Sequence, residues 1–239
     1  MFTLFIANKN YSSWSLRPWI LMRQLGITFE EDLVPFCDGS SWELFRKFSP
    51  SGKVPCLMDN GVAVWDSMGI TEYLAERREG VWPGDDRART WARCAAAEMH
   101  SGFSVLRDIC GMNVGLRVAL HEISPALQQD LNRLEELWSE GLELFGGPYL
   151  AGSAFSAVDA FFAPVAYRVQ TYGLQLSPAC MAYAQLLLEL PGMQQWQREA
   201  LAEPWLDPGH EKGIAGVGRV TADLRTIVGQ TAGDGGVGG

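Results

Sequence analysis

Residues 11–19, YSSWSLRPW, follow an apolar run at residues 3–7 that predicts a buried strand, and they lead into a predicted helix. Serine is favourable at a helix start, because its hydroxyl accepts a hydrogen bond from a free amide of the first turn. Proline fits that first turn, where no donor is needed. Pro18 therefore predicts a helix that begins between Ser13 and Leu16.

The hydroxyls of Ser12, Ser13 and Ser15 are then expected at the positive end of this helix, which favours an anion. A serine at this position either caps the helix or donates a hydrogen bond to a bound anion. The segment alone leaves both roles open. A nucleophilic serine is not expected, because no histidine and aspartate are paired with these residues for a triad.

The composition bounds the class of protein. The chain has 239 residues, of which 47% are hydrophobic, enough for one large domain or two small ones. Its net charge of −9 argues against nucleic acid or an anionic membrane as the main partner, although a small anion needs only local positive groups. No apolar stretch reaches the ~18 residues of a membrane span, and the N-terminus does not resemble a signal peptide.

The cysteines indicate a reducing environment. The chain has five at irregular spacing, with no CxxC motif and no Cys/His pattern of the zinc type. We interpret them as buried thiols, and we expect a cytoplasmic protein without a metal site.

The first third of the chain alternates strand and helix patterns. After the first strand and helix, the pattern predicts strands at residues 28–35, 54–58 and 62–65 and helices at residues 40–48 and 67–77. This β-α-β-α-β-β-α order predicts a mixed four-stranded sheet with helices on both faces. A polar cluster with Pro and Gly at residues 79–86, EGVWPGDD, predicts a domain boundary.

The remainder of the chain predicts a helical domain at residues 87–205, in which residues 87–121 form one long helical pattern interrupted near Gly111. Ser156 and Asp159 form a near-capping box that predicts the start of a central buried helix, and Asp159 is interpreted as structural rather than catalytic. Residues 206–239 are rich in glycine, so we expect a mobile tail with at most a short helix or strand at residues 221–228.

The combined motifs resemble the soluble glutathione S-transferase family, in its zeta-like, serine-type form. YSSWSLRPW resembles the SSxSxR segment of zeta-class enzymes, SPSGKVPCL at residues 49–57 resembles NPxxxVPxL, and WDSMGITEYLAER at residues 65–77 resembles [EQ]SxAIxxYL. SAFSAVDAFFAP at residues 153–164 resembles the family's helix-start signature. The resemblance covers residues 2–205 and implies a thioredoxin-like domain at residues 1–80, an all-α domain at residues 87–205 and a Gly-rich tail.

The resemblance also implies a glutathione site. The Val54–Pro55 peptide bond is expected to be cis, so that the backbone of Val54 pairs with the cysteinyl part of glutathione. Asp66 and Ser67, at a helix start, are expected to receive the γ-glutamyl end. Lys53 is expected to pair with a carboxylate of the ligand.

The catalytic residue implied by the resemblance is Ser12, with Ser13 as the close contender. Its hydroxyl hydrogen-bonds the glutathione sulfur and lowers the thiol pKa, and the resulting thiolate attacks an electrophile. Arg17 adds charge nearby or points to solvent. Further contacts to the second substrate are expected from the first long helix of the second domain, through Arg107, Asn113 and Arg117.

The sequence departs from the zeta pattern at Trp14, where cysteine is usual, and at Asp66, where Glu or Gln is usual. Three functions therefore remain open: a transferase for small electrophiles, a glutathione-dependent cis-trans isomerase of an unsaturated diacid of the maleylacetoacetate isomerase type, or a low-turnover glutathione-binding stress protein. The resemblance also implies a homodimer, for which Trp91 and Phe103 are candidate exposed aromatics.

Overall fold

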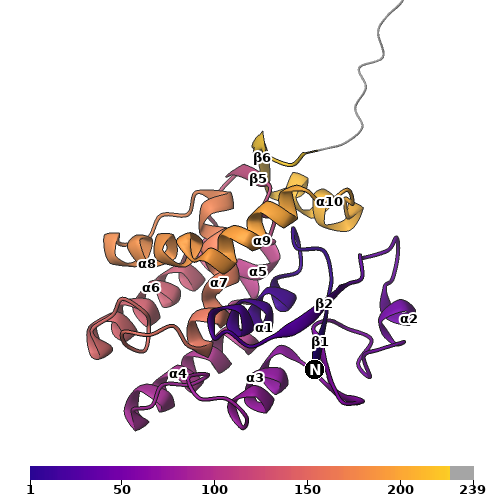
Figure 1. Ribbon diagram of the computed structural model, residues 1–239. Helices are drawn as coiled ribbons and strands as arrows, with labels where there is room; N and C mark the ends of the chain where they lie inside the picture. Colours follow the sequence, from indigo (N-terminus) through magenta and orange to yellow (C-terminus); the bar gives the residue numbers. More distant parts are fainter. Residues whose placement is uncertain (227–239) are drawn as a thin grey trace, which may run out of the picture.

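The computed structural model describes residues 1–226 (Figure 1). Its first part holds a four-stranded sheet in the order β2-β1-β3-β4. Strand β1 pairs in parallel with β2 and antiparallel with β3, and β3 pairs antiparallel with β4. The strands are β1 (Phe2–Ile6), β2 (Phe29–Leu33), β3 (Cys56–Asp59) and β4 (Val62–Val64). The predicted mixed four-stranded sheet is thus confirmed.

The helices of this part are α1 (Ser13–Gln24), α2 (Trp42–Phe45) and α3 (Ser67–Ala75). Helix α1 begins where the sequence predicted, but Pro18 lies inside it rather than in the first turn. Burial of Trp19, Ile20 and Leu21 stabilises the helix through this position, although proline leaves one carbonyl without an intrahelical donor. Helix α2 is shorter than predicted, because Phe45 is its only buried residue.

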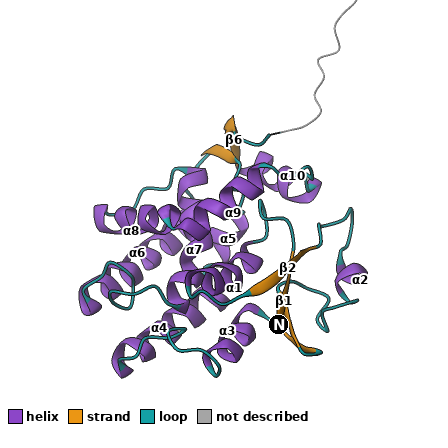
Figure 2. Ribbon diagram, in the orientation of Figure 1, coloured by secondary structure: helices purple, strands orange, loops and turns teal. Residues whose placement is uncertain are grey.

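The second part of the chain is helical, as predicted, and most of the helices in Figure 2 belong to it. Its helices are α4 (Asp86–Ser101), α5 (Ser104–Ile109), α6 (Pro125–Phe145), α7 (Ala157–Tyr172), α8 (Pro178–Glu189) and α9 (Pro191–Leu201). Helix α7 is buried along almost its whole length and packs against α1, α4 and α8. It therefore joins the sheet domain to the helical bundle. The loop between α3 and α4 spans the predicted domain boundary, which stays a prediction.

Residues 87–121 do not form one long helix interrupted near Gly111. Helix α4 ends at Ser101, α5 follows, and the chain then forms strand β5 (Leu116–Leu120). Gly102 is required at the break, because a Cβ there would lie 2.8 Å from the carbonyl oxygen of Glu98. Phe103 follows with a φ of 52°, which ends the helical path, and its side chain is buried rather than exposed.

The segment predicted to be a mobile tail is partly folded. It forms α10 (Pro208–Val217) and β6 (Gly218–Asp223), and β6 pairs antiparallel with β5 (Figure 1). Of the short helix or strand expected at residues 221–228, the strand is present at the first positions. Its stabilising partner, β5, lies about a hundred residues earlier in the chain, so local composition did not reveal it. Residues 227–239 lie outside the described part of the chain.

Asp159 confirms the structural role predicted for it. The backbone amides of Leu150 and Ser156 donate to its carboxylate at 3.0 and 2.9 Å, and the hydroxyl of Tyr183 donates at 2.9 Å. These bonds complete the capping box of α7. Burial nevertheless raises the pKa of Asp159 to about 6. The carboxyl group thus fixes the start of the central helix.

The cysteines are free thiols, but the prediction that all are buried is wrong: Cys37 and Cys94 are exposed. Trp91 is half-buried and donates to Glu140. Within residues 1–226, no helix is long and apolar enough to cross a membrane. The same residues contain no group of three or more His, Cys, Asp or Glu side chains that would hold a metal ion.

Replacing Asp159 with alanine is expected to lower the free energy of unfolding by about 3 kcal/mol, because two buried amides lose their acceptor. Tyr183→Phe removes one donor only and is expected to cost about 1 kcal/mol. Urea denaturation followed by circular dichroism measures both. The exposed Asp86 provides the control, and a cost for Asp159→Ala no larger than that of Asp86→Ala contradicts the assignment.

Candidate functional site

A cavity of about 510 Å³ lies between the sheet domain and the helical domain. On the sheet side it is lined by Ser12 and Ser13 at the start of α1 and by Lys53 and Val54 in the loop before β3. The Val54–Pro55 peptide bond is cis, which confirms the expectation for this loop. On the opposite side the lining comes from α5, α7 and α10, through Arg107, Asp108, Arg168 and His210.

Two neighbouring cavities share lining residues with this one. A cavity of about 410 Å³ shares Trp14, Lys53 and Val54 with it and reaches Asp66. Another, of about 380 Å³, shares Arg107 and other residues of α5 with it, as well as His210, and continues beneath α10. The three form one continuous depression from the start of α3 to α10, here called the cleft.

The hydroxyl of Ser12 is not used to cap α1, since this helix has no side-chain hydrogen bond at its N-terminus. Instead, Ser12 donates to the hydroxyl of Ser15 at 2.7 Å, and Ser15 accepts from the amide of Ala7 at 3.3 Å. Ser13 accepts from the guanidinium of Arg168 at 3.4 Å. The side chains of Ser12 and Ser13 therefore do not cap α1, which was one of the two roles considered for these serines.

Tyr11 supplies a further hydroxyl near the cleft, but that hydroxyl is already engaged. It donates to Glu211 at 2.7 Å and accepts from Arg225 at 3.3 Å. Burial, followed by the bond to Glu211, raises the pKa of Tyr11 well above its usual value. This leaves the two serines as the hydroxyls available at the start of α1.

Three arginines lie near the start of α1. Arg17 is buried rather than solvent-facing, and its guanidinium stacks on Trp14 and Phe161 at 4.1 and 4.8 Å from the ring centres. Burial and the neighbouring arginines lower the pKa of Arg17 to about 9. Burial also lowers the pKa of Arg168 to about 10. Arg17 does not line the cleft, whereas Arg107 and Arg168 do. The wall opposite the serines is thus electropositive.

Arg168 and His210 are among the cleft residues that sequence reasoning missed. Arg168 stands in an apolar helix, where a charged residue at a buried position was a usable signal. His210 lies in the segment that composition predicted to be mobile, so no local signal marked it. Both enter the cleft through tertiary packing.

Asp66 begins α3, where its carboxylate accepts from the amides of Met68 and Gly69 at 2.9 and 3.4 Å. It lines the cleft, whereas Ser67 is fully buried, and the Ser67 hydroxyl has no partner among the described residues. Asp66 also lies 3.4 Å from His100. Burial lowers the pKa of His100, and Asp66 partly opposes this effect.

Asn113 and Arg117 do not line the cleft. Asn113 is fully buried, donates to Glu211 at 3.1 Å and accepts from the amides of Gly115 and Leu116. Arg117 lies on β5 and donates to backbone carbonyls, including that of Leu116 at 2.7 Å. The chain leaves its helical path before both residues, which explains why a helical projection misplaced them.

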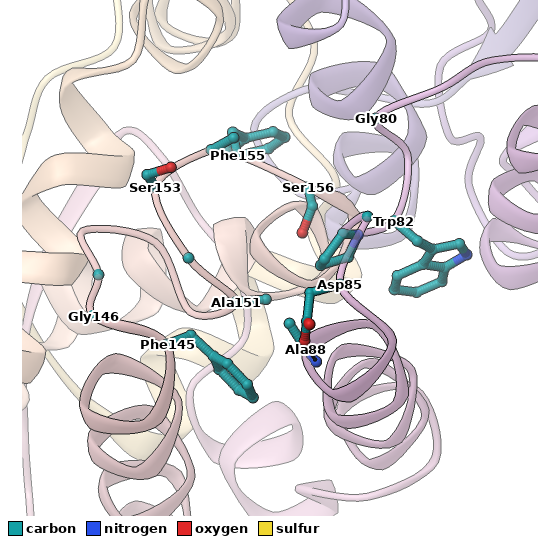
Figure 3. Close-up of a pocket in the computed structure, with 15 residues that line it drawn as sticks. Gly80, Trp82, Asp85, Ala88, Phe145, Gly146, Ala151, Ser153, Phe155 and Ser156 are labelled. Atoms are coloured by element: carbon teal, nitrogen blue, oxygen red, sulfur yellow. Dashed lines mark hydrogen bonds between the residues drawn. The ribbon is translucent and has the colours of Figure 1, made fainter.

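A separate cavity of about 640 Å³ lies elsewhere (Figure 3). The connection between α3 and α4, including Trp82, forms one side, and the loop before α7, including Phe155, forms another. It shares no lining residue with the cleft. It contains none of the residues for which the sequence predicted chemistry, so volume alone does not locate the functional site.

A cis-proline loop facing hydroxyls at a helix N-terminus, in an α/β domain followed by a helical domain, defines a two-domain protein of the thioredoxin-like class. The glutathione S-transferase N-terminal domain model matches residues 11–77, and the C-terminal domain model matches residues 117–196. The chain belongs to the glutathione S-transferase family, which confirms the resemblance of its motifs.

Individual relatives agree with this family. Maleylacetoacetate isomerase of Rattus norvegicus is 29% identical over 178 residues, which cover 71% of this chain and 79% of that protein. A stringent starvation protein A homolog of Haemophilus ducreyi is 26% identical over 180 residues, covering 74% of this chain and 78% of that protein. A glutathione transferase homolog from Burkholderia, solved with bound glutathione, has a TM-score of 0.63 at 21% identity and covers 83% of this chain and 97% of that one; this last likeness shows the fold.

Replacing Asp66 with asparagine is expected to lower the pKa of His100 further. Asparagine still caps a helix, but it removes the carboxylate that raises this pKa against burial and the nearby arginines. The chain has three histidines, so NMR titration of the imidazole signals resolves the change. Asp86→Asn, at an exposed position, is the control. A His100 pKa that stays the same or rises in Asp66→Asn contradicts the contact.

Proposed function

We propose that this chain binds glutathione along the cleft, ionises its thiol at Ser12 and transfers the thiolate to small electrophiles. The observation that carries the proposal is the placement of Ser12, Ser13 and Val54 around one cavity whose opposite wall carries Arg107 and Arg168. Family membership supports glutathione as the co-substrate.

In the proposed pose, the backbone of Val54 pairs with the cysteinyl part of glutathione as an added strand would. The free amides at the start of α3, together with Ser67, receive the γ-glutamyl carboxylate. The hydroxyl of Ser67, which is buried and has no partner within residues 1–226, supports this role. Asp66 then pairs with the γ-glutamyl amino group, and the exposed Lys53 pairs with the other carboxylate.

Ser12 is proposed as the direct donor to sulfur. Among the described residues, its hydroxyl bonds only to the hydroxyl of Ser15, and hydroxyl hydrogens rotate. When a thiolate binds, Ser15 takes over as donor to Ser12, and the proton of Ser12 turns to the sulfur. The chain of two hydroxyls at the positive helix end stabilises the anion and so lowers the thiol pKa. Ser13 supports the site by its contact with Arg168.

Ser12→Ala is expected to lower kcat/KM for a chloronitroaromatic acceptor by about 10- to 100-fold near neutral pH, because the thiol pKa rises by about one to two units. The loss is expected to shrink at high pH, where the thiol ionises without help. Steady-state rates and the ultraviolet absorbance of bound thiolate against pH measure the effect. Ser13→Ala is the matched control, and a larger loss there makes Ser13 the direct donor instead.

A second candidate is glutathione-dependent cis-trans isomerisation of an unsaturated diacid. Arg107 and Arg168 on the cleft wall favour it, because arginine holds carboxylates in fixed geometry. Similarity to a maleylacetoacetate isomerase supports the same substrate class. Here the thiolate adds to the double bond, the remaining single bond rotates, and elimination restores the thiolate.

Arg107→Met is expected to raise KM for a maleyl-type diacid by about tenfold or more, because one charged contact is lost. The KM for an uncharged chloronitroaromatic acceptor is expected to change by less than about twofold. Arg78, which is exposed in the loop after α3, provides the control as Arg78→Met. Equal loss with both acceptors argues that Arg107 has no role in binding a carboxylate.

Retention on immobilised glutathione separates these enzyme functions from the remaining alternative, a glutathione-binding stress protein with little turnover. Binding without either activity favours that alternative, and failure to bind contradicts the proposed site. We also propose a homodimer in the cytoplasm, as the family resemblance implies, and sedimentation of the purified chain tests the oligomeric state.

A further inference from the structure

His210 brings an imidazole into the cleft from a part of the chain outside both matched family domains. It lies on α10 and lines the same cavity as Ser12 and Ser13. Its ring stacks on Tyr11 at 4.9 Å between ring centres and on Phe36 at 5.5 Å, with interplanar angles of 25° and 28°. The two aromatic contacts hold the plane of the imidazole at the mouth of the cleft.

A contact with Asp207 fixes the rotation of this ring within its stacking plane. Oδ2 of Asp207 lies 2.6 Å from Nδ1 of His210 and also accepts from the backbone amide of His210 at 2.9 Å. With Nδ1 bonded to a carboxylate, the neutral ring carries its hydrogen there and leaves Nε2 free to accept a proton. A carboxylate paired with imidazole in this way is the arrangement that orients a general base.

Helix α10 is tethered over the cleft by charged groups as well as by the β5–β6 pairing. Arg225 donates to Glu211 at 2.6 Å and to Asp223 at 2.7 Å, and Glu211 accepts from Tyr11 at 2.7 Å. Tyr11 directly precedes the serines, so these bonds join the helix that carries His210 to the segment that carries Ser12. The position of His210 thus follows from the folded structure rather than from a loose terminus.

We propose that His210 is a catalytic residue that accepts the proton of the glutathione thiol, an inference that rests on the proposed glutathione function. The S–H bond breaks, its electron pair stays on sulfur, and the proton forms an N–H bond at Nε2. Asp207 stabilises the resulting imidazolium as a positioning residue. The side chain of His210 is 40% exposed, so the proton passes on to water once the thiolate has reacted.

In this proposal, Ser12 and His210 act on the sulfur in different ways. Ser12 stabilises the thiolate once it exists, but a hydroxyl is a poor proton acceptor near neutral pH, whereas an imidazole is suited to that role. The other ionisable groups around His210 lie on both sides. The cleft side carries Lys53, Arg107 and Arg168 together with Asp108, and the α10 side carries Asp207 and Glu211, with Arg225 paired to Glu211. The cations of the cleft favour the thiolate.

The test replaces His210 with phenylalanine, which keeps an aromatic ring for the stack and removes the proton acceptor. We expect His210→Phe to lower kcat/KM for a chloronitroaromatic acceptor by about 100-fold near neutral pH. The difference from wild type is expected to fall towards about twofold above about pH 9, where the thiol ionises to solvent. The dissociation constant of glutathione is expected to change by less than about twofold, because the ring is not a ligand of the tripeptide backbone.

Asp207→Asn provides the matched variant for the positioning role. Asparagine retains the helix cap but not the charge, so we expect a smaller loss with the same recovery at high pH. Circular dichroism and thermal melting confirm that each variant folds. An unchanged pH profile in His210→Phe overturns the inference, as does a loss of glutathione binding equal to the loss of rate, which would mark a structural role.

Measurements on the wild-type chain show whether a negative result contradicts the role of His210 or the proposed glutathione function itself. If the wild type neither binds glutathione nor turns over an acceptor, the proposed function is wrong and His210 loses its role with it. If the wild type is active and His210→Phe matches it at every pH, only the role of His210 is wrong.

Discussion

The contact between α1 and α7 is the constraint on which the cleft depends. Helix α1 belongs to the sheet domain and α7 to the helical bundle, and their packing sets the distance between the two walls of the cleft. The start of α7 is fixed by the buried carboxyl group of Asp159, and its far half carries Arg168. The N-terminal serines of α1 therefore face a guanidinium whose own position is determined by the core.

Burying the two arginines near this contact costs free energy of folding. Arg17 and Arg168 are almost fully buried, no carboxylate forms an ion pair with either within residues 1–226, and the pKa of each is lowered by burial. Stacking on aromatic rings and hydrogen bonds to carbonyls offset part of the desolvation. Uncompensated positive charge is understandable if a thiolate or a carboxylate completes the site. The buried charge at this contact is therefore consistent with the anionic ligand proposed for the cleft.

The sequence was informative where local chemistry and order along the chain were enough. The helix start at Ser13 and the capping box at Asp159 were predictable, because each is set by residues within a few positions. The cis peptide before Pro55 was expected from the family resemblance of its motif. The predictions were wrong where contacts between residues far apart in the sequence determine the local structure. Pro18 sits inside a helix held by packing, and β5 and β6 form because each supplies the other's hydrogen bonds. The helical pattern through Arg117 is accordingly broken, and that residue turns away from the cleft.

The sequence by itself determined the family, the two-part architecture and the sheet-side half of the candidate site, from Ser12 to Asp66. These features depend on local motifs whose backbone geometry follows from residue type. Only the tertiary structure decided the opposite wall, where Arg168 and His210 approach the serines from α7 and α10. Their proximity comes from the packing of helices about 150 to 200 residues further along the chain, and no spacing in a sequence encodes a contact of that kind.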